Sequence, residues 1–431
     1  MESFTLSKIL LCLGLLFCVL LIFSLFVSSL AQTSGIKWSR TFGSGEEDVC
    51  YSVIQSSDDG FVLVGHTKTF DLNGDVWLIK TDSFGNMEWN RTYGGDDWDR
   101  ANCLVETSDG GYAIAGYTYS FSEGFGDFWL FKTDNNGNVQ WSQIYGGSNL
   151  ERANCLVETS DRGFALVGYS NSFGAGEYDF CLVKTDPLGE LEWNQTYGGI
   201  DKDVAWSLVE TSDGGYALAG DTLSFGAGDH DFLLVKTDSY GNIEWNQTYG
   251  KESYDYAYSV VESIDGGYAL AGISHSEASD DFWLVKTDSE GKMLWNKLFK
   301  KGDHSVAYSL IVLSDGGYGL AGYSHSIFGL QGIDFWLVKT DKYGNLNLSK
   351  TFGGADTECA YSVIETSDGG FALAGYTDSF GNGGLDFWLV KTDEYGNIPE
   401  FSSWTILSIT IMISIIVLVF RKTRSFNKLD E

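Results

Sequence analysis

The sequence has little proline and few basic residues, and each shortage excludes a class of protein. Only 2 of the 431 residues are Pro, whereas 53 are Gly and 15% are aromatic. This composition is that of a folded protein with many turns and excludes a disordered chain. Lys and Arg number 27 against 59 Asp and Glu, so the formal net charge is −32. Such a charge repels phosphate backbones and excludes nucleic acid as a favoured partner.

Paired cysteines and catalytic motifs are also missing. None of the five cysteines that follow the N-terminal apolar segment forms a CxxC pair: Cys50, Cys103, Cys155, Cys181 and Cys359. Cys103 and Cys155 stand where other repeat copies carry Ser, which indicates small strand residues and not a disulfide framework. No GxSxG, HExxH, P-loop or Rossmann motif occurs, so no catalytic residue is predicted. An acid–base carboxylate pair stays open, because 59 acidic residues make chance pairs inevitable.

Both ends of the chain have the pattern of a membrane segment. Lys8 precedes an apolar run over residues 9–27, and small residues then fit a signal-peptidase site. Residues 1–31 are therefore predicted to be a signal peptide or, alternatively, an uncleaved anchor. Residues 402–420 carry no charge and predict a transmembrane helix, and the positive-inside rule places the basic tail 421–431 in the cytoplasm. The intervening part is then predicted to be extracellular, at the cell membrane.

The segment Pro399-Glu400-Phe401, followed by the apolar stretch and a basic cluster, resembles the PEF-type carboxy-terminal sorting signals of archaeal surface proteins. The resemblance implies that the tail is cut and replaced by another anchor. A permanent single-span anchor is the alternative.

One repeat of about 52 residues fills the chain between the two membrane segments. The copies are marked by Trp38, Trp89, Trp141, Trp193, Trp245 and Trp295, with Leu348 in the seventh place. In the copy that starts at Trp193, the pattern predicts strands over 192–197, 205–211, 215–221 and 231–237. The last of these is a continuous apolar run, which indicates a strand buried on both faces. Gly- and Asn-rich turns separate the strands, and four antiparallel strands per copy are typical of a propeller blade.

The two ends of the repeat array predict how the ring closes. The last copy lacks its Trp strand, and the first copy begins with an orphan Trp strand over residues 36–42. We therefore predict an all-β fold, a seven-bladed β-propeller over residues 36–397 that is closed by the N-terminal strand. Closure removes the exposed sheet edges that promote aggregation.

The consensus GGYALAG…DFWLVKTD…GN..W..TYGG, which spans residues 36–397, resembles that of secreted repeat proteins of archaea and bacteria. Those proteins are mostly uncharacterised, so the resemblance implies a secreted propeller and no particular ligand. Kelch and WD-repeat propellers are a looser comparison, since no Trp-Asp ending is present.

Two charged positions recur in every copy. An Asp opens the fourth predicted strand: Asp75, Asp127, Asp179, Asp231, Asp281, Asp334 and Asp386. These carboxylates either form a ring for a cation or accept backbone N–H groups in the preceding loop, and their presence in all copies favours the second interpretation. A Lys recurs two residues before a turn Asp, as Lys80 does before Asp82, which predicts a local ion pair. The segment 71–75 partly resembles a calcium loop but lacks the downstream Glu, so calcium stays an alternative.

Four sequons on the predicted extracellular part are glycosylation candidates, at Asn90, Asn194, Asn246 and Asn347. Three of them directly follow the repeated Trp. If the Trp side chain points inward, strand alternation points the Asn outward.

Four of the five histidines fall in loops that are predicted to share one face of three consecutive copies. His230, His275 and His325 precede the fourth strand of their copies, and His304 follows a Trp strand. Asp280 and Asp303 lie in the same loops. Because these positions differ between copies, we predict that they carry whatever ligand or metal site exists, and imidazole with carboxylate suits zinc. Drift of surface loops is the alternative.

No cofactor is evident beyond the calcium and zinc alternatives. We predict a non-enzymatic cell-surface propeller that binds a protein or a glycan, or builds envelope structure. The alternative is an extracellular propeller enzyme, a hydrolase, lyase or quinoprotein-like protein, with its site on one propeller face.

Overall fold

The computed structural model describes residues 38–69, 73–122, 124–276, 279–325 and 332–398. The predicted signal peptide or anchor (1–31), the transmembrane helix (402–420) and the basic tail (421–431) lie outside these residues. Within the described ranges, no helix combines the length and the apolar character that crossing a bilayer demands.

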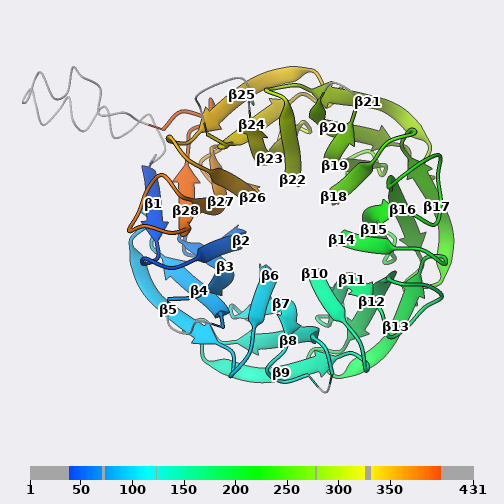
Figure 1. The fold of residues 1–431 in the computed structure, drawn as a ribbon, viewed down its shortest axis with the longest axis horizontal. Helices are drawn as coiled ribbons and strands as arrows, with labels where there is room; N and C mark the ends of the chain where they lie inside the picture. Colours follow the sequence, from blue (N-terminus) through cyan, green and yellow to red (C-terminus); the bar gives the residue numbers. More distant parts are fainter. Residues whose placement is uncertain (1–37, 70–72, 123, 277–278, 326–331, 399–431) are drawn as a thin grey trace, which may run out of the picture.

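The described residues form 28 strands, arranged as a ring of sheets around a central axis (Figure 1). One sheet contains β1 (Trp38–Phe42), β28 (Asp386–Lys391), β27 (Phe371–Thr377) and β26 (Glu358–Glu365). The next contain β2 (Asp48–Gln55), β3 (Phe61–Thr67), β4 (Asp75–Thr81) and β5 (Met87–Tyr93), then β6 (Asp99–Glu106), β7 (Tyr112–Thr118), β8 (Asp127–Thr133) and β9 (Val139–Tyr145). They are followed by β10 (Glu151–Glu158), β11 (Phe164–Ser170), β12 (Asp179–Thr185) and β13 (Leu191–Tyr197), then β14 (Asp203–Glu210), β15 (Tyr216–Thr222), β16 (Asp231–Thr237) and β17 (Ile243–Tyr249).

The remaining eight strands form one sheet. One half contains β18 (Asp255–Glu262), β19 (Tyr268–His275), β20 (Asp280–Thr287) and β21 (Met293–Phe299). The other half contains β22 (His304–Val312), β23 (Tyr318–His325), β24 (Asp334–Thr340) and β25 (Leu346–Phe352). A single parallel pair, Asp280 with His304, joins the halves. The prediction of an all-β propeller fold built of four-stranded units is confirmed at this level.

The repeat determines the strands through burial. β16 has the predicted bounds, and all its residues are buried because a sheet lies on each side of it. The outer strand β13 is mostly exposed. Gly214 and Gly241 adopt positive φ angles of 83° and 78° in the two tight turns that flank β15 and β16, which explains why glycine stands there.

The first and last sheets of the sequence lie side by side. β1 pairs antiparallel with β28, so that Trp38 lies opposite Lys391. In the turn that follows β26, the Ser367 N–H donates at 2.8 Å to Oε1 of Gln55, the last residue of β2. Equivalent Ser–Glu bonds join other neighbouring sheets, as the Ser212 N–H does with Glu262 Oε2 at 2.8 Å.

Serine and cysteine side chains also link neighbouring inner strands. Ser207 Oγ accepts the Val260 N–H at 3.2 Å. Cys103 stands at the equivalent position, where its thiol contacts the Leu156 carbonyl at 3.6 Å. The cysteines of the described chain carry free thiols.

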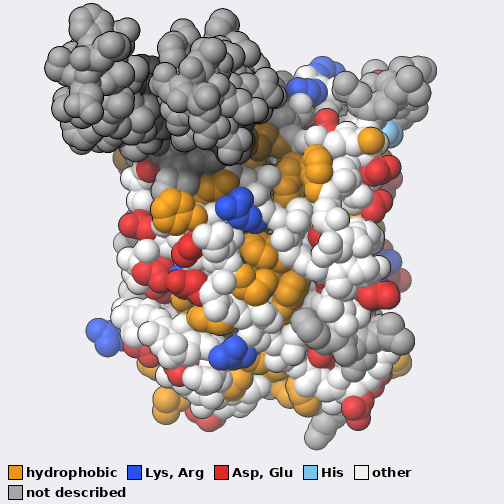
Figure 2. Space-filling view, turned by 90° about the vertical axis from the view of Figure 1, so that its left-hand side faces the viewer, with side chains coloured by type: hydrophobic (Ala, Val, Ile, Leu, Met, Phe, Trp, Pro, Cys, Tyr) orange, Lys and Arg blue, Asp and Glu red, His pale blue; other side chains and the backbone are white. Residues whose placement is uncertain are grey.

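Chain direction alternates along each sheet and gives the ring two different faces. The turns over residues 211–215 and 238–242, with their equivalents, form what we call the turn face. The loops that precede strands such as β16, and the loops that join one sheet to the next, form the opposite face, which we call the loop face. Figure 2 shows the outer wall near β1 and β28, where hydrophobic side chains gather among acidic ones.

Candidate functional site

Three of the predicted site residues meet on the loop face. His275 ends β19, Asp280 begins β20 and His304 begins β22. Nδ1 of His275 donates to Asp280 Oδ1, and Nδ1 of His304 donates to Asp280 Oδ2. Asp280 is buried, whereas the His275 and His304 side chains are 32% and 36% exposed. One buried carboxylate therefore orients two imidazoles that solvent can still reach.

Tyrosines continue this group on both sides. Tyr254 stacks on His275 with the ring centroids 4.2 Å apart and donates its hydroxyl to Asp280 Oδ1 at 3.2 Å. The Tyr323 hydroxyl lies 2.7 Å from His304 Nε2. Burial raises the pKa of both tyrosines, so their hydroxyls stay protonated at neutral pH. We call His275, Asp280, His304, Tyr254 and Tyr323 the histidine cluster.

His230 has a carboxylate of its own. Its Nδ1 lies 2.7 Å from Asp221 Oδ2, and Trp206 Nε1 donates to Asp221 Oδ1 at 2.7 Å. The His230 ring centroid lies 4.7 Å from that of Tyr256, which lies 5.7 Å from that of Tyr254. Two tyrosine rings thus connect His230 to the histidine cluster.

His325 and Asp303 reach the cluster through the backbone. His304 lies opposite His325 in the ladder between β22 and β23. The Asp303 N–H donates to the His325 carbonyl at 2.8 Å, and the Asp303 carbonyl accepts the Asp280 N–H at 3.1 Å. Of the six predicted residues, three are therefore joined by side-chain hydrogen bonds, one by ring contacts and two by main-chain bonds.

Within the described ranges, no group of three or more His, Cys, Asp or Glu side chains is placed to hold a metal ion. The two cluster imidazoles turn toward the oxygens of Asp280 and not toward a common centre. Zinc and calcium binding stay predictions, and Asp71 of the calcium-like segment lies outside the described residues.

Aromatic side chains, which the sequence analysis missed, follow the inner strands. Figure 1 shows these strands around the centre of the ring. The aromatic side chains occupy one position of five consecutive inner strands: Trp206, Tyr258, Tyr308, Tyr361 and Tyr51. Successive ring centroids lie 5.4, 4.9, 4.9 and 5.0 Å apart, and all five side chains are half-buried. We call this row the aromatic wall. The Tyr308 ring lies 6.0 Å from that of Tyr323, so the wall adjoins the histidine cluster.

Amide and guanidinium groups occupy the remaining part of the ring. Asn102 and Asn154 stand at the wall position, and each donates to a backbone carbonyl of the next inner strand at 2.8 Å. Arg100 lies over the Tyr51 ring at 3.7 Å, and Arg152 lies over another tyrosine ring at 4.5 Å. Arg152 also lines a loop-face cavity of about 380 Å³ together with Asp97, Trp98, Tyr117 and Tyr119. The centre of the ring is therefore chemically asymmetric, as a site on a repeat scaffold requires.

The fifth histidine, His66, lies between the wall and this cavity. Its ring centroid is 5.7 Å from that of Tyr51 and 4.8 Å from that of Trp98. Burial, with the nearby Arg100 charge, lowers its pKa to about 3. His66 is consequently neutral at physiological pH and packs as an aromatic side chain.

Six of the seven repeated Asp residues begin the third strand of their sheets, and Asp179, Asp231 and Asp386 accept loop N–H groups. Asp281 is the second residue of β20 and accepts the Ser279 hydroxyl at 3.1 Å. Asp179 Oδ2 accepts from Ala175 at 2.7 Å, and Asp386 Oδ2 accepts from Asn382 at 2.8 Å. The other oxygen of Asp179 faces the next sheet: a Cβ on Gly198 would overlap it and lie 2.6 Å from Asp203 Oδ2. Burial raises the pKa of Asp179, Asp231, Asp334 and Asp386. Cation binding by this ring stays a prediction.

The predicted partner of the repeated Lys was wrong. Lys80 is buried, and its Nζ lies 2.8 Å from Asp58 Oδ2 in the turn between β2 and β3. Asp82 instead accepts N–H groups of its own turn, such as that of Phe84 at 2.9 Å. The strand order explains the difference, because β3 and β4 are neighbours and bring the Asp58 turn against the end of β4.

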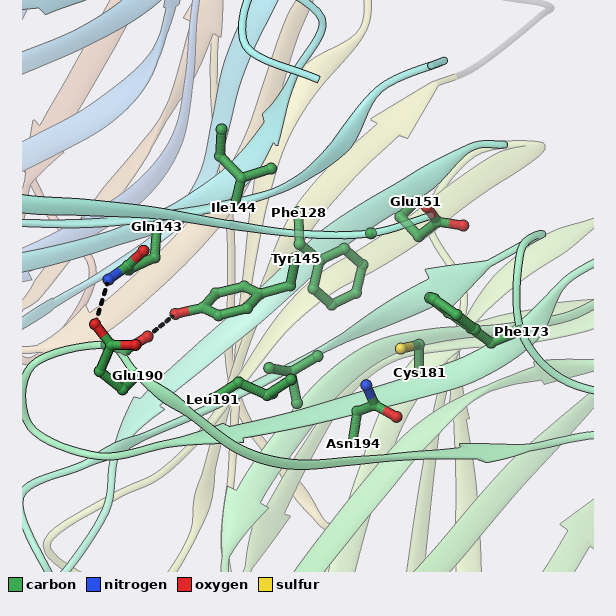
Figure 3. A pocket seen from close by; sticks show the side chains of 13 residues that line it. Phe128, Gln143, Ile144, Tyr145, Glu151, Phe173, Cys181, Glu190, Leu191 and Asn194 are labelled. Carbon is green, nitrogen blue, oxygen red and sulfur yellow. Dashed lines mark hydrogen bonds between the residues drawn. The ribbon is translucent and has the colours of Figure 1, made fainter. Parts of the chain in front are cut away.

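The sequons lie on outer strands. Asn194, Asn246 and Asn347 are exposed, whereas Asn90 is half-buried and accepts a hydrogen bond from Trp77 Nε1 at 3.3 Å. Asn194 borders a pocket of about 300 Å³ between β9 and β13, which Figure 3 shows. Its wall includes the exposed side chains of Ile144 and Leu191, and the Tyr145 hydroxyl closes one end on the Gly189 carbonyl at 2.5 Å.

No protein-family model matches the chain, and no curated protein matches it. Among solved structures it is similar to Sqt1 from Chaetomium thermophilum, which is 13% identical over 85% of this chain and 87% of Sqt1, with a TM-score of 0.49. The Pan2 WD40 domain of Neurospora crassa is 12% identical over 63% of this chain and 71% of that one, with a TM-score of 0.41. A puromycin hydrolase mutant is 12% identical over 80% of this chain and 52% of that one, with a TM-score of 0.46. These likenesses concern the fold alone. The chain's own strand topology is that of an all-β propeller.

Proposed function

We propose that this chain is a non-enzymatic binding module of the cell surface, and that its loop face binds a neutral glycan at the centre of the ring. In this proposal the propeller has seven blades, is closed by β1, and is held outside the cell by its C-terminal segment with the basic tail in the cytoplasm. The asymmetric centre of the ring carries the proposal, because five aromatic rings face a sector of amide and guanidinium groups.

The chemistry of this centre suits a saccharide chain better than a protein surface. Aromatic faces with a few oriented polar groups are the usual lining of small-ligand sites. The aromatic wall is half-buried and lies on the inner strands of the ring, whereas protein interfaces are broad patches. A neutral glycan also avoids the repulsion that a net charge of −32 imposes on anionic ligands.

The test is glycan-array screening of the full-length chain, followed by calorimetry with the best neutral oligosaccharide. Trp206→Leu and Tyr258→Leu should each weaken binding about tenfold or more, the loss expected when a central aromatic anchor is removed. Tyr240→Ser, on the turn face, is the matched control and should bind as the native chain does. If the chain bound a protein ligand and no glycan, the proposed partner would be a protein instead. Equal affinities of all three variants would show that the aromatic wall is not the binding site.

An enzyme is the second candidate, and the histidine cluster is the observation that favours it. A carboxylate that holds an imidazole by Nδ1 is the arrangement of a general base. Asp280→Asn should then abolish turnover of a bound glycan while the glycan still binds. If the native chain binds the glycan without turning it over, the enzyme is excluded and the binding module remains as the function.

A further inference from the structure

The two ends of the described chain leave the propeller at the same face. β28 ends at Lys391, its turn runs through residues 393–397, and the description stops at Ile398. β1 begins at Trp38, opposite Lys391. Both predicted membrane segments therefore attach to the turn face, whereas the histidine cluster lies on the loop face.

The connection to the predicted transmembrane helix is short. Ile398 packs against the hydrophobic core of the last sheets, and the predicted helix begins at residue 402. Four residue steps span at most roughly 14 Å, even when fully extended. A propeller anchored in this way has its turn face within reach of the lipid headgroups.

The tips of the turns on this face carry large hydrophobic side chains. The residue before the turn glycine is Phe84, Leu188, Tyr240, Tyr343 or Tyr395 in five of the repeats, with exposed fractions of 52%, 64%, 71%, 61% and 64%. Nothing in their turns requires them, because Asn136 and Glu290 fill the same position in the other two repeats. Three of the five are Tyr, a residue type that is enriched at the interface between a membrane and water.

We propose that the turn face rests on the surface of a neutral lipid bilayer, with these turn tips at the headgroup level, and that the loop face is thereby held outward for its ligand. This inference rests on the proposed surface anchoring. Exposed hydrophobic side chains occur on the loop face too. Phe121 and Phe380 pack on Trp129 and Trp388 with ring centroids 5.5 and 5.4 Å apart, whereas Phe125 and Ile200 are 64% and 78% exposed. The short connection to the predicted transmembrane helix, and not hydrophobicity alone, therefore identifies the turn face as the one that meets the membrane.

Charge selects neutral lipids. Acidic side chains such as Asp58 and Asp82 border the turn tips, and Asp58 is compensated by the buried Lys80. With a chain charge of −32, an anionic surface would repel this face. Zwitterionic headgroups leave the aromatic contacts unopposed.

The experiment uses the full chain in phosphatidylcholine vesicles, with protease sites placed before Trp38 and after Ile398 so that the propeller can be released. Hydroxyl-radical footprinting, read by mass spectrometry, measures the oxidation of each aromatic residue before and after release. We expect oxidation of Tyr240, Tyr343 and Tyr395 to be lower by roughly threefold or more while the propeller is anchored, as for interfacial side chains. Oxidation of Phe121 and Phe380 should not change.

A matched pair of variants distinguishes the contribution of the turn-tip side chains from that of the short membrane connection. Both carry a flexible Gly/Ser insertion of about 20 residues after Ile398, long enough to let the propeller leave the surface. The chain with native turn tips should stay protected, and the chain with Tyr240→Ser, Tyr343→Ser and Tyr395→Ser should lose protection of Phe84. If the chain is anchored but its turn-tip tyrosines are not protected from oxidation, the proposal that the turn face rests on the bilayer is wrong. A chain that alkaline carbonate strips from the vesicles overturns the anchoring itself, and the proposed surface location with it.

Discussion

Deletion of strand β1 tests how the ring closes. The deletion removes Trp38 and Phe42, each 7% exposed, from a cluster that includes Phe61 of β3 and Leu389 of β28. Truncation of a buried Phe or Trp costs about 3–5 kcal/mol. The two losses, about 6–10 kcal/mol, match the whole unfolding free energy of a typical protein, about 5–15 kcal/mol. The deletion also leaves β28 as an open sheet edge, which promotes aggregation.

The assay is urea unfolding, with thermal scans at one fixed rate because large proteins often unfold irreversibly. The deletion chain should unfold at far lower urea or fail to stay monomeric. Trp38→Ala should lose about 3–5 kcal/mol, and Ser39→Ala, exposed on the same strand, should change stability by no more than about 0.5 kcal/mol. A deletion chain that unfolds at the same midpoint as Ser39→Ala refutes closure by β1.

Three further outcomes are expected. Lys132 lowers the pKa of Asp109 from 3.8 to about 2, so the pair stabilises the fold above pH 3.8 and this stabilisation is lost as the pH falls toward 2. Between these pH values the urea midpoint should therefore fall less in Lys132→Met than in the native chain, and an equal fall in both would contradict the pairing. Asp280→Asn should lower stability by about 1–3 kcal/mol, because His275 and His304 bond to different oxygens of Asp280 and the amide nitrogen that replaces one of them cannot accept a hydrogen bond. An unchanged urea midpoint would show that the cluster is not formed in solution. Protease added to intact cells should digest the propeller, and digestion only after lysis would overturn the extracellular topology.

The sequence by itself determined the local structure. The segment 231–237 became β16 with the predicted bounds, because its central residues 232–235 are all apolar, as a strand buried on both faces favours. Turn glycines such as Gly214 were recognisable because few other residues adopt positive φ. Repetition also placed His275 and His304 on one face, since chain direction alternates in any antiparallel sheet.

Only the tertiary structure decided which side chains meet. Lys80 was expected beside Asp82 and is paired with Asp58, because the neighbouring strand and not the next turn lies against it. The aromatic wall escaped notice because Tyr308 and Tyr361, more than 50 residues apart in sequence, come together only where inner strands converge on the centre of the ring. A repeat encodes its own strands and turns through local burial and backbone preference, whereas contacts between sheets depend on how the strands pack and on which neighbour each copy receives.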